Sequence, residues 1–118
     1  MKKKQFEKHV LSVYGVIPDK PFDEDFTTEV FRVKESKKWF AIYMSVPSEK
    51  FGLNGGKEDV VNLKCSPELS ADFIDNVSVF PAYHMNKTHW VSVLLSRADA
   101  EKIKLLTDIS YNAVSKTK

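Results

Sequence analysis

Nine residues, KWFAIYMSV at positions 38–46, decide the fold of this chain. Aromatic, aliphatic and β-branched side chains fill the stretch, which is the composition of a β-strand. Because successive side chains of a strand point to opposite faces, alternation divides the stretch into two sets. The set that we assign to the core comprises Phe40, Ile42, Met44 and Val46. The opposite set comprises Trp39, Ala41 and Tyr43.

Similar patterns around this stretch predict four more strands and three helices. The strands are expected at 30–34, 59–65, 79–84 and 88–95, the last two forming a hairpin. The helices are expected at 3–14, at 66–76 and from a cap at Ser96 or Asp99 to 115. Between the first helix and the first strand lies an irregular acidic connection, which Phe22 and Phe26 should anchor to the core.

The order of these elements is helix, three strands, helix, two strands, helix. It predicts an α+β fold in which an antiparallel sheet forms one layer. The N-terminal and C-terminal helices should pack together on one face of that sheet, giving a two-layer sandwich. At 118 residues, we expect the whole span 1–118 to be a single domain.

Composition narrows the function classes without selecting one. The formal net charge of +2 is too small to identify a nucleic-acid partner by itself. One cysteine permits no internal disulfide and fits a reducing cytoplasm. The lysine-rich start lacks the apolar stretch of a signal peptide, and no apolar run has the length of a membrane span. We therefore expect a cytoplasmic monomer with no membrane partner.

If helices cover one face of the sheet, the other face meets solvent or a partner. Alternation predicts that this face carries Arg32, Trp39, Ala41, Tyr43, Asn62, Lys64, Trp90 and Ser92. Interleaved cations and aromatic rings can bind nucleic acid, because cations pair with phosphate and rings stack on unpaired bases. The same residues could form an aromatic cluster that only stabilises the sheet, or lie beneath the loop at 47–58. On the residues alone, this structural interpretation is favoured.

The histidines His84 and His89 flank a turn, and a hairpin could place them directly opposite each other. Such a pair could bind a metal or move a proton, but no third ligand is near in the sequence. Cys65 falls on the predicted core face, where cysteine acts as a small apolar residue. The glycines at 52–56 lack the spacing of a phosphate-binding loop. We therefore expect no catalytic residues, no metal site and no cofactor.

Three motifs together carry a family resemblance. They are Val61-Asn62-Leu63-Lys64-Cys65, the stretch PAYHMNKTHW at 81–90, and Ser110-Tyr111. In combination they resemble the MmcQ/YjbR family over nearly the whole chain. The resemblance implies a fold similar to CyaY and frataxin. Members are commonly described as DNA-binding proteins with a "double wing". The residues that match the motifs are Asn62, Lys64, His84, Asn86, Lys87, His89 and Trp90.

The frataxin-like fold raises iron binding as a rival function. In frataxin-like proteins an acidic first helix carries that role, whereas this helix begins with Lys2, Lys3 and Lys4. Iron delivery is therefore not carried over with the fold. The first hypothesis is a DNA-binding module that uses Arg32 and the seven motif residues. The alternatives are a protein-interaction or small-ligand module on the same surface, and an enzyme built on the two histidines.

Overall fold

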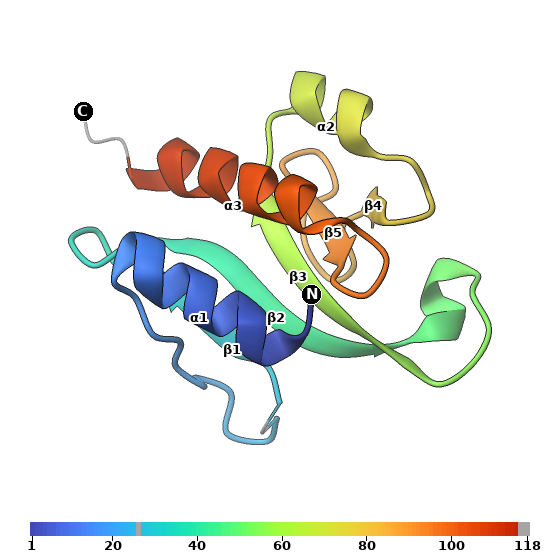
Figure 1. Cartoon of the computed structure of the whole chain (residues 1–118), viewed down its shortest axis with the longest axis horizontal. Coiled ribbons are helices and arrows are strands. Elements are labelled where there is room, and N and C mark those ends of the chain that lie inside the picture. Colours follow the sequence, from blue (N-terminus) through green and yellow to red (C-terminus); the bar gives the residue numbers. More distant parts are fainter. Residues whose placement is uncertain (26, 116–118) are drawn as a thin grey trace.

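The computed structural model describes residues 1–25 and 27–115. Figure 1 shows three helices and an antiparallel sheet with the strand order β1-β2-β3-β5-β4. The helices are α1 (Lys3–Tyr14), α2 (Pro67–Phe73) and α3 (Ala100–Ser115). The strands are β1 (Glu29–Arg32), β2 (Trp39–Pro47), β3 (Lys57–Lys64), β4 (Val79–Pro81) and β5 (Trp90–Leu94). A short 3-10 helix, η1 (Ser48–Phe51), follows β2.

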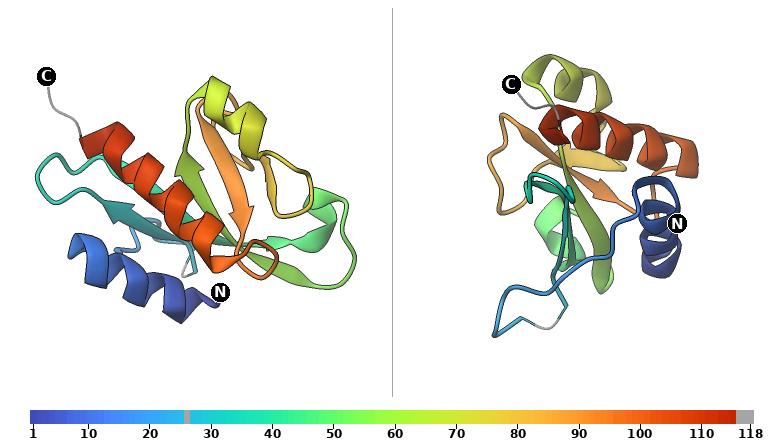
Figure 2. Two further views of the ribbon diagram at one scale, coloured as in Figure 1. Left: turned by 45° about the horizontal axis from the view of Figure 1, so that its top comes forward. Right: turned by 90° about the vertical axis from the view of Figure 1, so that its left-hand side faces the viewer.

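The predicted α+β fold and the predicted order of elements are confirmed. Figure 2 shows α1 and α3 packed on the same side of the sheet, as expected of a two-layer sandwich. Phe26, predicted to anchor the connection before β1, lies outside the described residues. None of the described helices is long and apolar enough to cross a membrane.

Local sequence signals fix the helix ends. Gly15 ends α1 with a left-handed φ of 68°, a conformation that glycine adopts without a steric penalty. Ser66 caps α2 by accepting the Leu69 N–H at 3.3 Å. Asp99 caps α3, because its carboxylate accepts the Lys102 N–H at 2.8 Å. The second helix stops at Phe73, three residues short of the predicted end.

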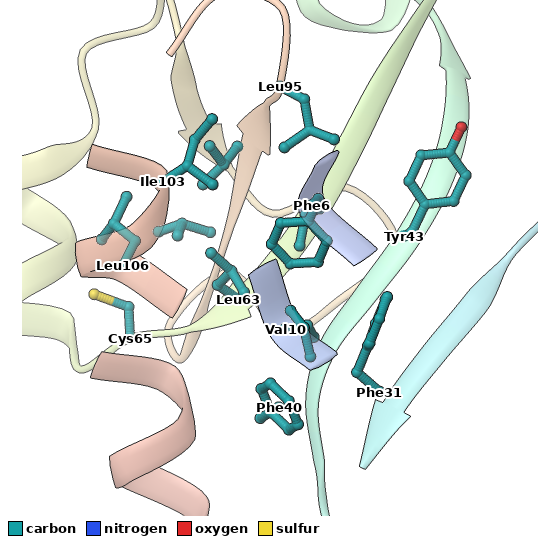
Figure 3. Close-up of a cluster of buried hydrophobic side chains, with 14 of the residues drawn as sticks. Phe6, Val10, Phe31, Phe40, Tyr43, Leu63, Cys65, Leu95, Ile103 and Leu106 are labelled. Atoms are coloured by element: carbon teal, nitrogen blue, oxygen red, sulfur yellow. The ribbon is translucent and has the colours of Figure 1, made fainter. Parts of the chain in front are cut away.

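The core lies between the helices and the sheet. Figure 3 shows Phe6 and Val10 of α1 beside Phe31 and Phe40 of the sheet. The helix α3 and the strands β3 and β5 supply much of the rest of this core. The buried residues of α3 are Ile103, Leu106, Thr107, Ser110 and Val114. In β3 and β5, and at the residue after each, alternation is confirmed, because the residues that alternate with the predicted outer set are buried in this cluster: Val61, Leu63, Cys65, Val91, Val93 and Leu95.

A bulge in β2 makes the prediction for that strand wrong. The pairing with β1 runs from Phe31–Ala41 directly to Arg32–Trp39, so Phe40 is an extra residue. Phe40 and Ala41 consequently both lie in the core cluster. From that point the alternation is reversed relative to the prediction. The core side receives Ala41 and Tyr43, whereas Ile42, Met44 and Val46 lie on the opposite face.

A serine hydroxyl from α3 closes the gap that the bulge leaves. Ser110 Oγ accepts the Lys64 N–H at 2.9 Å and donates to the Phe40 carbonyl. Lys64 and Phe40 lie just past the last regular β2–β3 pair, Ala41–Leu63. The fully buried hydroxyl therefore replaces a backbone hydrogen bond of the sheet.

Ser110→Ala should lower the free energy of unfolding by about 1–3 kcal/mol, because it leaves a buried N–H and a buried carbonyl unpaired. Urea unfolding measures the change. Ser12→Ala, an exposed helical serine, is the matched control and should change stability by less than about 0.5 kcal/mol. Equal stability of Ser110→Ala and wild type would show that the hydroxyl does not complete the sheet.

Two carboxyl groups meet where α1 packs on β1. Glu29 is 5% exposed, and its Oε2 lies 3.0 Å from Lys3 Nζ. Its other oxygen, Oε1, is buried without a hydrogen-bond partner. The pKa of Glu7 is raised, first by its side-chain hydrogen bond to Glu29 and then by burial. The neighbouring carboxyl of Glu29 therefore makes Glu7 easier to protonate than an isolated glutamate.

This contact should make stability depend on pH. A raised pKa in the folded state adds stability at low pH, and that stability is lost as the pH rises through the folded-state pKa. Glu7→Gln keeps a donor at every pH. Its unfolding free energy should therefore exceed the wild-type value by a growing margin as the pH rises above 4.5. Exposed Glu49→Gln is the control, and a margin that is constant with pH would contradict the raised pKa of Glu7.

Candidate functional site

The face of the sheet opposite α1 and α3 is the candidate site, and part of it is covered. Val46, Val60, Phe80 and Leu94 form a second apolar cluster there. Phe51 and Leu53, from the segment after β2, pack on this cluster together with Tyr83. The loop at 47–58, which we considered as a possible cover of this face, therefore covers one end of it.

The predicted hairpin of strands 79–84 and 88–95 is much shorter in the structure. The β4–β5 ladder pairs only Val79, Phe80 and Pro81 with β5. Proline cannot donate a ladder hydrogen bond, which explains why the strand ends at Pro81. The chain then forms a loop at 82–89, in which His84 has a left-handed φ of 62°. His84 and His89 are therefore not opposite each other in a ladder.

A buried polar cluster holds this loop against the sheet. Asn62 Nδ2 donates to the Tyr83 carbonyl at 3.1 Å, and the Ser92 hydroxyl donates to Asn62 Oδ1. The Ser92 hydroxyl also accepts the Tyr83 N–H at 2.8 Å. Asn62 is fully buried, so it lies beneath the predicted binding surface and cannot touch a ligand there. Its place in the motif is explained by the loop that it positions.

The tip of the loop is shaped by two further side chains. Asn86 Oδ1 accepts the Thr88 N–H at 2.8 Å, and the Asn86 carbonyl accepts the Trp90 N–H at 3.0 Å. This turn gives Asn86 a structural role while its side chain remains exposed. Lys87 Nζ donates to the Ala82 carbonyl at 2.8 Å, which ties the ammonium group to the loop.

Lys64 and Trp90 are brought together by the β3–β5 register, in which they are direct partners. Their neighbours Leu63 and Val91 point into the core, so by alternation Lys64 and Trp90 point to the opposite face of the sheet. The part of that face outside the second apolar cluster is called the uncovered face. Each is half-buried, and His89 beside them is exposed. Among the described residues Lys64 forms no ion pair, so its charge is available to a ligand.

Arg32 lies at the other end of the sheet and is already engaged. Its Nε is 3.3 Å from Asp19 Oδ2, and its guanidinium carbon lies 5.4 Å from the centre of the Trp39 ring. Phe22 meets the same ring edge-on at 6.2 Å. Tyr43, predicted on this face, instead lies on the helical side and donates to Asp59 at 2.6 Å.

An apolar pocket of about 430 Å³ opens between the loop at 82–89 and the connection before β1. Most of its walls are apolar or aromatic, and Asp25, Thr28 and His84 contribute the polar groups. The apolar and aromatic lining residues are Phe22, Trp39, Ile42, Met44 and Met85. Sequence reasoning missed this pocket, because the predicted alternation turned Ile42 and Met44 toward the helices. No residue in the sequence of β2 marks the bulge, because Phe40 is as favourable in a regular strand as its neighbours are.

The other predicted candidates have simple structural roles. Cys65 is buried, and burial raises the pKa of its thiol, which disfavours the nucleophilic thiolate. His84 lines the apolar pocket, whereas His89 does not. Within residues 1–25 and 27–115, no three histidine, cysteine, aspartate or glutamate side chains are placed to hold a metal ion.

Asn62→Ala should destabilise the protein by about 1–3 kcal/mol, because the buried Tyr83 carbonyl and Ser92 hydroxyl lose their partner. Amide hydrogen exchange should accelerate at Tyr83 more than at Val61. Asn54→Ala, in an exposed loop, is the control and should leave both rates unchanged. Unchanged exchange at Tyr83 in Asn62→Ala would contradict a role in holding the loop.

Comparisons with known proteins agree with this architecture. The YjbR family model matches residues 11–113. The uncharacterised protein YyaQ of Bacillus subtilis is 42% identical over 95 residues, which cover 80% of each chain. A crystal structure of a Pseudomonas syringae protein has a TM-score of 0.91 at 37% identity, covering 96% of this chain and 98% of that one. A Deinococcus radiodurans protein has a TM-score of 0.68 at 27% identity, covering 93% and 78%.

Proposed function

This chain belongs to the YjbR family, and from that membership we propose that it binds DNA through the uncovered sheet face and residues 84–90. The observation that supports the proposal best is the direct pairing of Lys64 with Trp90 on that face. A cation next to a partly exposed indole offers both a phosphate contact and a ring for base or sugar contacts. His89 extends the same patch with an exposed imidazole.

The remaining candidate residues take different parts in this proposal. His84 and Asn86 supply polar contacts from the exposed loop, and Lys87 must exchange the Ala82 carbonyl for a phosphate to do so. Arg32 supplies a charge beside Trp39 and must exchange Asp19 for a phosphate to do so. Asn62 makes no contact with DNA and instead positions the loop from below.

Lys64→Ala should weaken DNA binding and reduce the slope of log affinity against log salt by about 0.9, the value for one phosphate contact. A titration with duplex DNA at several salt concentrations, followed by tryptophan fluorescence, measures the slope. Lys57→Ala is the matched control, because Lys57 lies at the opposite end of the same strand. An identical slope for Lys64→Ala and Lys57→Ala would rule out the assigned surface.

A small-ligand module is the second candidate, and the apolar pocket beside Trp39 favours it. A pocket of about 430 Å³ is within the size range of small-molecule sites, and its apolar and aromatic lining is typical of them. The same titration separates the two candidates. No DNA binding even at low salt would exclude the first function and leave the pocket as the site.

A further inference from the structure

The helical side of the molecule carries a groove that the proposed DNA contact does not use. It lies between α1 and α3, and its volume is about 670 Å³. Its polar lining comes from Gln5, Lys8, His9 and Ser12 of α1 and from Lys104 of α3. Figure 2 shows the two helices side by side on one side of the sheet.

The lining of this groove is rich in hydrogen-bond donors and contains no carboxylate. Two ammonium groups, a hydroxyl, an amide and an imidazole line it. Within the described part of the chain, neither Lys8 nor Lys104 forms an ion pair. Two positive charges without a counter-charge across one groove favour an anionic ligand.

Two aspartates of the chain near this groove are engaged elsewhere. Asp99, at the start of α3, accepts the Lys102 N–H at 2.8 Å as the helix cap. Asp108, one turn beyond Lys104, accepts the Tyr14 hydroxyl at 3.0 Å and the Asn112 amide at 3.3 Å. Neither aspartate lines the groove.

His9 reports the electrostatics of the groove. Its pKa is lowered, first by burial and then by the positive charge of Lys104, while Asp108 acts in the opposite direction. An anion bound between Lys8 and Lys104 would oppose the effect of Lys104 and stabilise the imidazolium. The pKa of His9 therefore provides a local readout of occupancy.

We propose that the groove between α1 and α3 binds a phosphate-bearing anion, with Lys8 and Lys104 holding it from opposite sides. Phosphate fits this lining because it combines negative charge with several acceptor oxygens. The groove can serve either a free phosphorylated molecule or a phosphate of a nucleic-acid backbone. It is a separate site from the Lys64 and Trp90 surface, so binding of pyrophosphate in the groove does not depend on whether that surface binds DNA.

Pyrophosphate is the probe, and two measurements follow it. Proton NMR of His9 across a pH series should show a higher pKa with pyrophosphate than without. Calorimetry should show pyrophosphate affinity at least about tenfold weaker in Lys8→Gln/Lys104→Gln than in wild type. Lys50→Gln/Lys57→Gln removes the same charge from exposed positions outside the groove and should retain wild-type affinity. Thermal unfolding of both double variants confirms that each is folded.

A duplex DNA arm identifies the source of the phosphate. If the backbone occupies the groove, the duplex raises the pKa of His9 as pyrophosphate does. If a free phosphorylated molecule is the ligand, pyrophosphate alone raises it. Equal pyrophosphate affinity in the two double variants, or an unchanged pKa of His9 with pyrophosphate, overturns the proposal. Loss of DNA binding in Lys64→Ala leaves both pyrophosphate measurements unaffected.

Discussion

The hydroxyl of Ser110 is the contact on which the arrangement of the sheet depends. It joins the Lys64 N–H to the Phe40 carbonyl at the point where β2 carries one extra residue. Without such a bridge, the bulge would leave two buried backbone groups unpaired. With it, Phe40 and Ala41 both enter the core, and the following residues of β2 exchange faces.

The bulge decides what each side of the sheet can do. It turns Tyr43 toward α1, where Lys3 Nζ lies 4.9 Å from the centre of its ring. On the other side it places Ile42 and Met44 on the floor of the pocket that Trp39 and His84 line. The uncovered face is therefore more apolar than a purely basic binding surface would be. Its free charge is concentrated beside Trp90, at Lys64.

The candidate residues differ in the internal contacts that each must give up before it can contact a ligand. Asn62 is buried in the cluster that holds the loop, and Lys87 is tied to the Ala82 carbonyl. Arg32 is paired with Asp19. Lys64, by contrast, has only its backbone engaged, through Ser110. Motif membership alone would have treated these side chains as equivalent.

The sequence was sufficient for the order of the elements and for most of the helix ends. Caps such as Ser66 and Asp99 act locally, so their signals are legible in a few residues. The faces of β3 and β5 were also predicted correctly, because those strands alternate without interruption. The face of β2 was not, since its bulged residue Phe40 bonds to Ser110, which lies 70 positions along the chain.

Contacts between distant residues also limited what the sequence could predict about the candidate site. The pairing of Lys64 with Trp90 follows from a β3–β5 register that no short motif specifies. The loop at 82–89 replaced a regular hairpin because Pro81 ends β4 and Asn62 holds Tyr83. Tertiary contacts between distant segments thus decided which histidines and lysines became accessible.

The two tryptophans provide the most direct test that the uncovered face binds DNA. The chain contains only two, so its proton–nitrogen spectrum should show two indole signals. Addition of duplex DNA should shift the Trp90 indole signal and the Lys64 backbone amide, and leave Tyr43 and its neighbours in the core unchanged. An unmoved Trp90 signal under conditions where the duplex binds would contradict the account.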